Sequence, residues 1–249
     1  MTISKWRIAM CSGAFVAATG TLLAAEGTHW SYSGPTGPEH WAELSSKYAA
    51  CGIGLNQSPV DITDPVTADL DALKFDYRGS ATSIVNNGHT IQINVAPGSW
   101  LTIGDEKFQL IQFHFHSPSE HRINGKLFPL AAHLVHQNEA GALAVVGVLY
   151  RAGAPNKNLQ RFGDIAPVEV NQPVATDMDL TELGLFEDHE SYYRYNGSLT
   201  TPPCTEGVRW FVLKAVGHVA LAQVENFVEL IGEDARGPQS VNARIILEN

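Results

Sequence analysis

A two-residue alternation of side chains in two long segments is the feature that most constrains the fold. The segments 110–116 and 130–136 are long enough for strands, and the two-residue period of a strand sends alternate side chains to opposite faces. One face of the first segment is predicted to carry Leu110, Gln112, His114 and His116, with Ile111, Phe113 and Phe115 on the other. One face of the second is predicted to carry Ala131, His133 and Val135, with Ala132, Leu134 and His136 opposite.

Other segments also read as strands, whereas helical patterns are short. Strands are predicted at 82–85, 89–95, 108–116, 130–136, 143–150 and 208–216, and helices at 38–48, 158–165 and 221–230. The unbroken apolar run 143–150 is typical of a strand buried on both faces. We therefore expect a β-dominated α+β fold: a single domain around a large twisted, mostly antiparallel sheet with short peripheral helices.

The N-terminal 25 residues are predicted to be a secretory signal peptide. Lys5 and Arg7 precede an apolar stretch, and Leu22–Ala25 forms a small-residue cleavage zone. The apolar stretch is interrupted and short for a membrane span, and no later segment is suited to cross a bilayer. We expect residues 26–249 to form one catalytic domain that is exported, either to the periplasm or out of the cell, without a membrane anchor after cleavage.

Charge excludes one class of partner. The formal net charge is −10, and the signal segment holds two basic residues and no acidic one, so its removal takes the charge to −12. Such an acidic protein is not expected to bind nucleic acid or an anionic membrane surface.

Two cysteines remain after the signal segment, which itself contains Cys11. Cys51 and Cys204 form an even pair in an exported protein, so we predict one disulfide. Two buried free thiols are the alternative, which fits an oxidising compartment poorly.

The histidines of the two alternating segments indicate a metal site. If the strands pair, His133 converges with His114 and His116 on one point, and three neutral imidazoles with an open fourth position are typical of catalytic zinc. A His-x-His pair on a strand is also compatible with hydrogen-bonded core histidines, so the spacing alone leaves both interpretations open.

Short motifs in order along nearly all of the mature region resemble the α-class carbonic anhydrases. The matching stretches are His29–Tyr32, Gly37–Trp41, Asn56–Ile62, Asn86–His89, Gln112–His116, Pro118–His121, His133–His136, Gly197–Cys204 and Asn242–Arg244. The resemblance implies a zinc enzyme that reversibly hydrates carbon dioxide to bicarbonate and a proton. It also implies the periplasm by similarity to bacterial members, and it leaves a homodimer open.

The resemblance also implies roles for single residues. His114, His116 and His133 would hold Zn²⁺, which lowers the pKa of its bound water and so supplies hydroxide. Thr200 would accept a hydrogen bond from that hydroxide and donate its own to Glu120. His89 would shuttle the product proton. Without the resemblance, Thr200 and His89 read as turn residues and Glu120 as a solvated acid.

Two further groups follow from the same resemblance. The residues implied to support a ligand or organise cavity water are Gln112, Tyr32, Asn87 and Gln92. Those implied to contact carbon dioxide are Val135, Val145, Leu199, Thr201, Val208 and Trp210. Strict alternation puts His89 and Gln92 on opposite faces of their strand, so we expect a bulge between them. The apolar residues are equally compatible with an ordinary core.

One position departs from the family pattern. Two residues before the third ligand, where the family usually has a glutamate that accepts a histidine N–H, this chain has Ala131. Losing such an acceptor typically costs about 10–100-fold in metal affinity or activity, so we expect weaker, faster-exchanging zinc. The alternative function is a catalytically weak or silent binding protein. Another hydrolytic zinc enzyme is disfavoured because no HExxH helix is present.

Overall fold

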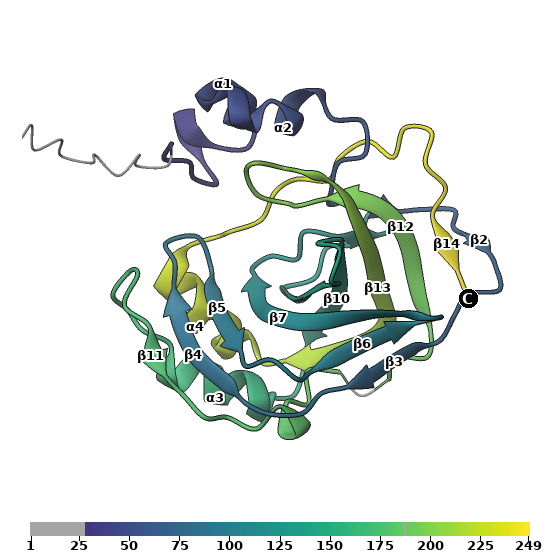
Figure 1. The fold of residues 1–249 in the computed structure, drawn as a ribbon. Helices are drawn as coiled ribbons and strands as arrows, with labels where there is room; N and C mark the ends of the chain where they lie inside the picture. Colours follow the sequence, from purple (N-terminus) through teal and green to yellow (C-terminus); the bar gives the residue numbers. More distant parts are fainter. Residues whose placement is uncertain (1–27, 187) are drawn as a thin grey trace, which may run out of the picture.

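The computed structural model describes residues 28–186 and 188–249, and most of its strands join one curved sheet of twelve strands (Figure 1). The predicted signal peptide lies outside the described residues. The strands of this sheet are β2 (Val66–Thr67), β3 (Leu73–Asp76), β4 (Ala81–Asn86), β5 (Ile91–Val95), β6 (Trp100–Ile103), β7 (Glu106–His116), β9 (Leu130–Gln137), β10 (Leu143–Ala152), β11 (Val174–Ala175), β12 (Tyr192–Ser198), β13 (Glu206–Val219) and β14 (Leu247–Glu248). A second, two-stranded sheet pairs β1 (Asp61–Ile62) with β8 (Arg122–Ile123).

The helices are short and lie around the sheet, as predicted. They are α1 (Trp41–Leu44), α2 (Ala50–Ile53), α3 (Lys157–Ile165) and α4 (Leu221–Ile231), with 3₁₀ turns η1 (Gly34–Thr36), η2 (Ser46–Tyr48) and η3 (Leu180–Glu182). In Figure 1, α1 and α2 lie above one end of the sheet, and the segment after α4 crosses that same end to reach β14. None of the helices in the described ranges is long and apolar enough to cross a membrane.

The centre of the sheet is the series β5, β7, β9, β10, β13 and β12. Its neighbours are antiparallel except for the pair β10 and β13, which runs parallel. Strand β10 lies between β9 and β13, and its residues 144–150 are all buried. The predicted strand with two buried faces, and the mostly antiparallel fold class, are therefore confirmed.

Strand β7 departs from strict alternation at one point. Its pairing with β9 shifts register between Leu110 and Gln112, and Ile111 at the shift is 39% exposed. Leu110 therefore joins the buried face of Phe113 and Phe115. The prediction that Leu110 shares a face with the histidines, and Ile111 with the phenylalanines, was wrong because a β-bulge reverses the phase.

Two apolar clusters lie on either side of the central strands. The larger one, which includes Phe113, Phe115 and Leu134, packs against α3 and α4 through Phe162 and Phe227. The smaller one contains Ala131, Val145 and Trp210. The alternation predicted for β9 is confirmed, because Ala132 and Leu134 face the larger cluster while Ala131 and Val135 face the smaller one.

Candidate metal centre

Three histidines converge on neighbouring strands. His114 and His133 are direct cross-strand partners of β7 and β9, and His116 lies one alternation further along β7. One nitrogen from each ring can be chosen so that all three lie within 4.8 Å of one another. His116 and His133 are each only 1% exposed, and His114 is half-buried. The predicted convergence of these side chains is confirmed.

The other ring nitrogens have different surroundings. His114 Nδ1 donates to Gln112 Oε1 at 2.9 Å, and His116 Nδ1 donates to the backbone oxygen of Asp234 at 2.7 Å. His133 Nδ1 lies 3.7 Å from Glu120 Oε2, whereas its buried Nε2 has no hydrogen-bond partner among the described residues. Ala131, the position that would offer an acceptor in the family pattern, is fully buried.

The donor set fits a metal ion. The buried Nε2 of His116 also has no hydrogen-bond partner in the described part of the chain, although it faces Glu120 Oε2 at 3.6 Å. Buried polar atoms without partners are rare, and here they belong to two of the three converging imidazoles. Three neutral imidazoles are a ligand set that suits zinc.

Two carboxylates dominate the charge around His116. Burial lowers the pKa of His116, but the Glu120 and Asp234 carboxylates outweigh burial and raise it to about 9. The pKa values of His114 and His133 are held well below the usual value, first by burial and then by the charge of His116. Burial raises the pKa of Glu120, which His116 and hydrogen bonds partly oppose.

Glu120 and Thr200 are brought together, as predicted. Glu120 is 1% exposed, and its Oε1 accepts a 3.0 Å hydrogen bond from the backbone N–H of Arg236. The Thr200 side chain lies close enough to Glu120 to act to lower its pKa. Both are buried, so Glu120 is not the solvated acid of the alternative interpretation, whereas Thr200 does lie in a bend that follows β12.

His89 lies in the turn between β4 and β5, not in a strand. The Asn87 side chain accepts hydrogen bonds from the N–H groups of His89 and Thr90, each at 2.9 Å, and Gly88 has a φ of +83°. The expected bulge between His89 and Gln92 was therefore wrong, because the turn ends before β5 begins at Ile91.

The His89 ring stacks on Trp30 with centroids 3.7 Å apart. Its pKa is lowered by partial burial and by the nearby charge of His29.

The remaining predicted site residues fall into two places. Gln92 is the cross-strand partner of His114, and Asn87 Nδ2 donates to its Oε1 at 3.5 Å. Tyr32 packs edge-on against Trp30, and burial, followed by the charges of Glu120 and Asp234, raises the pKa of its hydroxyl.

The predicted apolar residues gather beside the histidines. Val145, Val208, Trp210, Val135 and Leu199 belong to or pack against the smaller apolar cluster. The Trp210 ring lies 4.8 Å from that of His133. Thr201 is half-buried, and its backbone oxygen accepts from the Cys204 N–H at 2.8 Å.

Cys51 and Cys204 form the predicted disulfide, with an S–S distance of 2.07 Å. It joins α2 to the loop that follows Thr200, across a sequence separation of 153 residues. The alternative of two free thiols was therefore wrong.

Several residues around the site were not predicted. His121 is buried beside His133 and pairs its Nε2 with Tyr195 Oη at 2.7 Å; burial and the charge of His116 lower its pKa to about 3. Asp234 and Arg236 contact His116 and Glu120 from a segment that lies outside every predicted strand and helix. His121 lies inside the stretch Pro118–His121 that resembles the family, so the sequence could have indicated a role for it. Asp234 lies in none of the matching stretches.

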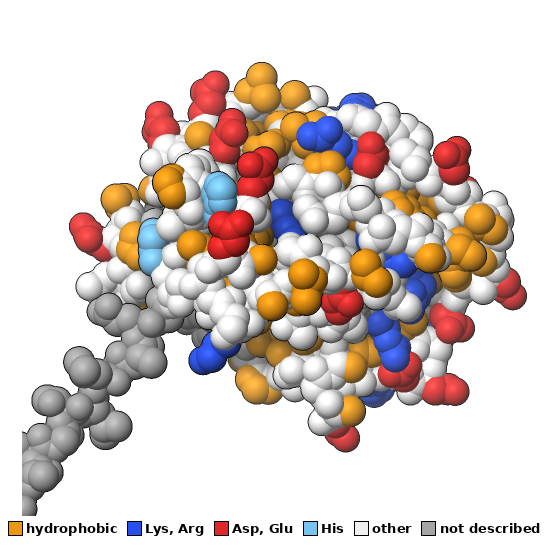
Figure 2. Space-filling view, turned by 90° about the horizontal axis from the view of Figure 1, so that it is seen from above, with side chains coloured by type: hydrophobic (Ala, Val, Ile, Leu, Met, Phe, Trp, Pro, Cys, Tyr) orange, Lys and Arg blue, Asp and Glu red, His pale blue; other side chains and the backbone are white. Residues whose placement is uncertain are grey.

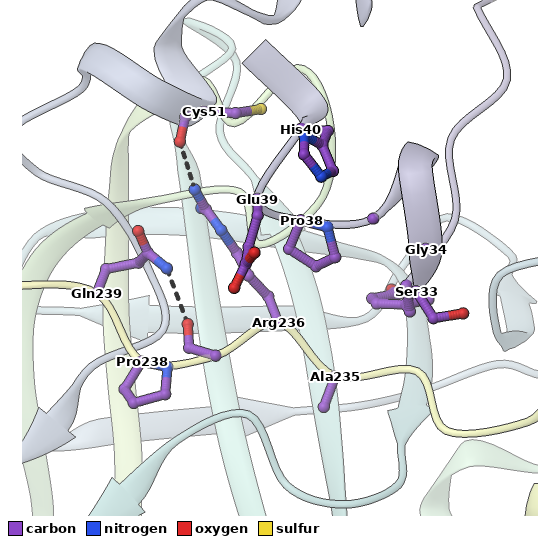
Figure 3. A pocket seen from close by; sticks show the side chains of 13 residues that line it. Ser33, Gly34, Pro38, Glu39, His40, Cys51, Ala235, Arg236, Pro238 and Gln239 are labelled. Carbon is purple, nitrogen blue, oxygen red and sulfur yellow. Dashed lines mark hydrogen bonds between the residues drawn. The ribbon is translucent and has the colours of Figure 1, made fainter. Parts of the chain in front are cut away.

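A separate cavity of about 680 Å³ is lined by residues that precede α1 and by the segment 235–239 (Figure 3). Arg236 lines it, with its guanidinium turned toward the backbone oxygen of Cys51, and Tyr32 and Glu39 are also among its lining residues. None of the three converging histidines lines this cavity, so its size does not mark the metal centre.

The described site has close counterparts in known proteins. The eukaryotic-type carbonic anhydrase family matches residues 36–248. The chain belongs to this family. A carbonic anhydrase of Neisseria gonorrhoeae is 43% identical over 242 residues, which cover 94% of each chain. The structure of the α-carbonic anhydrase from Thermovibrio ammonificans, in complex with sulfanilamide, is 43% identical, with a TM-score of 0.85 over 89% of this chain and all of that one.

A second solved structure, the α-carbonic anhydrase of Photobacterium profundum, is 44% identical with a TM-score of 0.82, and the match covers 88% of this chain and all of that one. The family assignment makes this chain a carbonic anhydrase (carbonate dehydratase), which catalyses hydration of carbon dioxide. Its histidine triad is typical of the α-class metal site.

Proposed function

We propose that this carbonic anhydrase uses Zn²⁺ held by His114, His116 and His133, with residues 26–249 as its catalytic domain. The observation that carries the proposal is the convergence of three buried or half-buried imidazoles, one nitrogen of each within 4.8 Å of the others, where the buried His116 Nε2 has no hydrogen-bond partner among the described residues. When bound, zinc lowers the pKa of a coordinated water to about 7, which supplies a nucleophile at neutral pH.

Thr200 and Glu120 are proposed to orient the nucleophile. Glu120 accepts from the Arg236 N–H and has the Thr200 side chain beside it, so we propose that Thr200 donates its single hydroxyl hydrogen to the carboxylate. The Thr200 oxygen can then only accept a hydrogen bond, which fixes the direction of the attacking oxygen. This is electrostatic preorganisation by two side chains that are themselves held in place.

The apolar residues are proposed to hold carbon dioxide beside that oxygen. Val145, Val208 and Trp210 are at most 2% exposed and lie on the side of the site occupied by His133. A nonpolar substrate gains from such a surface, which offers no competing hydrogen bond. Leu199, Thr201 and Val135 would complete the contact.

His89 is proposed to receive the product proton on its ring and pass it to solvent buffer. Its pKa lies below the ordinary value because of burial and the charge of His29, so the neutral, proton-accepting ring is populated at neutral pH. Tyr32, Asn87, Gln92 and Gln112 are proposed to organise the water or ligand contacts of the site.

Export to the periplasm or beyond is part of the same proposal. A disulfide between Cys51 and Cys204 supports it, because such bonds persist in oxidising compartments. The acidic side chains around the outline of the face in Figure 2, with basic ones interspersed, agree with the prediction of no nucleic-acid partner. A homodimer stays a prediction, which sedimentation velocity of residues 26–249 tests.

The deciding experiment is stopped-flow hydration of carbon dioxide by zinc-loaded residues 26–249, alongside a His116→Ala variant. We expect a rate far above that of the variant, together with about one zinc per wild-type chain. Equal zinc content in wild type and variant would contradict the proposed metal site. A zinc-loaded wild type without excess activity would favour the weak or silent alternative that Ala131 raises.

A further inference from the structure

A buried carboxylate lies directly behind one of the proposed ligands. Asp234 is 0% exposed, and its Oδ2 lies 3.4 Å from His116 Nδ1. The same Nδ1 donates to the Asp234 backbone oxygen at 2.7 Å. Oδ1 accepts from the Ser117 N–H at 2.7 Å, whereas Oδ2 has no hydrogen-bond partner in the described ranges. Of the three proposed ligands, Asp234 Oδ2 therefore contacts His116 alone.

The three proposed ligands are supported unequally. An amide oxygen supports His114, and no acceptor among the described residues reaches Nε2 of His133, whereas His116 has both a carbonyl oxygen and a carboxylate on its outer side. The cross-strand partner of His116 is Ala131, so the position of the missing family acceptor lies directly across the strand pair from the ligand that the carboxylate contacts. In this chain the carboxylate behind the ligand set therefore lies at His116.

We propose that Asp234 is the carboxylate that positions and strengthens this metal centre, acting through His116 in place of an acidic side chain at Ala131. The proposal rests on the proposed zinc site. A carboxylate behind a ligating imidazole fixes its orientation and raises its basicity, so it slows loss of the metal.

The backbone that carries Asp234 is held independently of its side chain. Two residues later, Arg236 donates to Gln57 Oε1 at 2.9 Å, to the Ser58 oxygen at 2.8 Å and to the Cys51 oxygen at 2.9 Å. Figure 3 shows Arg236 reaching from this segment toward Cys51. Replacing the Asp234 carboxylate by an amide therefore leaves the backbone acceptor of His116 in place, and Asp234→Asn isolates the charge.

The test compares wild type, Asp234→Asn and a matched control, Asp61→Asn. Asp61 also accepts a backbone N–H, that of Gly125 at 3.0 Å, but contacts no ligand. The measurements are the rate of zinc transfer to a chromogenic chelator and the visible absorption of the cobalt(II)-loaded protein. We expect Asp234→Asn to release zinc about 10–100-fold faster and to shift the cobalt bands, with the control unchanged.

Circular dichroism and melting of the metal-free proteins check that each variant folds. If Asp234→Asn is unfolded, Asp234→Ser takes its place, since a hydroxyl can still accept from the Ser117 N–H, and the same result is expected. Ala131→Glu in the Asp234→Asn background is expected to restore part of the lost zinc retention. Release rates and cobalt spectra equal to wild type would overturn the role of Asp234.

The experiment distinguishes failure of the proposed zinc site from failure of the proposed role of Asp234. If wild type takes up no zinc, or if His116→Ala takes it up equally well, the proposed function is wrong and the role of Asp234 is overturned with it. Stoichiometric uptake through the histidines, combined with an unchanged release rate for Asp234→Asn, overturns the role of Asp234 alone.

Discussion

The unpartnered Nε2 of His133 is the least supported group at the site. It is buried, and the side chain at Ala131 offers no acceptor. We predict that Ala131→Glu slows zinc dissociation by about tenfold or more, because the added carboxylate can accept the free N–H of the ring. The rate at which zinc passes from the zinc-loaded wild type and from zinc-loaded Ala131→Glu to a chromogenic chelator measures the difference. Equal rates, or slower loss from the natural protein, would contradict the prediction.

The proton-transfer role of His89 gives a separate prediction. His89→Ala removes the ring that stacks on Trp30 and should lower kcat for hydration on the order of 100-fold in weak buffer, the usual size of a general-base contribution. Zinc content should not change, because His89 is not among the converging histidines. Stopped-flow assays with added imidazole test the role: recovery of kcat supports it, and an undiminished kcat in weak buffer contradicts it.

The sequence predicted some of the contacts between single residues of the site but not others. The ligands, Gln112, Glu120 and Thr200 lie within motifs whose order and residue types matched a family, so their contacts could be expected. Asp234 could not, because it is 118 residues from His116 and lies in a segment without strand or helix. Irregular backbone has no period from which a side-chain direction can be inferred.

Between elements, His136 links β9 to the residue that follows β3. Its Nδ1 donates to the Ala144 oxygen at 3.2 Å, and its Nε2 pairs with Tyr77 Oη at 2.6 Å. The neutral ring is thus satisfied on both sides while fully buried. Burial is the main cause that lowers the pKa of His136 to about 4.

This lowered pKa predicts a pH dependence of stability. The unfolded chain binds a proton at His136 below about pH 6.5, whereas the folded chain does so only near pH 4, so folding is opposed progressively as pH falls between these values. The loss attributable to His136 should be on the order of 3 kcal/mol at pH 4 and absent above pH 7.

Urea unfolding of wild type and His136→Gln across pH 4–7 tests this contribution, because groups common to both proteins cancel. The free energy of unfolding of wild type should fall more steeply with decreasing pH. Parallel curves would show that His136 does not contribute.

The long strands were largely predictable because β7, β9, β10 and β13 have clear periods or apolar runs. The bulge at Ile111 was not, since it depends on pairing with β9 rather than on the local sequence. The strands β3, β6 and β12 were missed altogether. The parallel pairing of β10 with β13 could not be predicted either, because the pattern of side chains within a strand does not indicate the direction of its neighbour.

At the scale of the whole molecule, the disulfide links two positions that are far apart in the sequence. Cys51 and Cys204 close a loop with a sequence separation of 153, which restricts the unfolded chain. We predict that Cys51→Ser/Cys204→Ser loses about 4–5 kcal/mol of stability, as the chain-entropy description of long loops gives. Guanidinium unfolding of the oxidised wild type and the double variant measures the difference; no change would contradict the prediction.

Because Asp234 follows His116 by 118 residues, chain order also sets an order of assembly. A polypeptide that emerges from a ribosome or a translocon presents His114, His116 and His133 well before the segment that supports His116. If Asp234 has the proposed role, a partly emerged chain can hold metal only loosely and exchange it with its surroundings. Firm capture then waits until residues 234–236 have docked, which makes metal retention a late step of maturation.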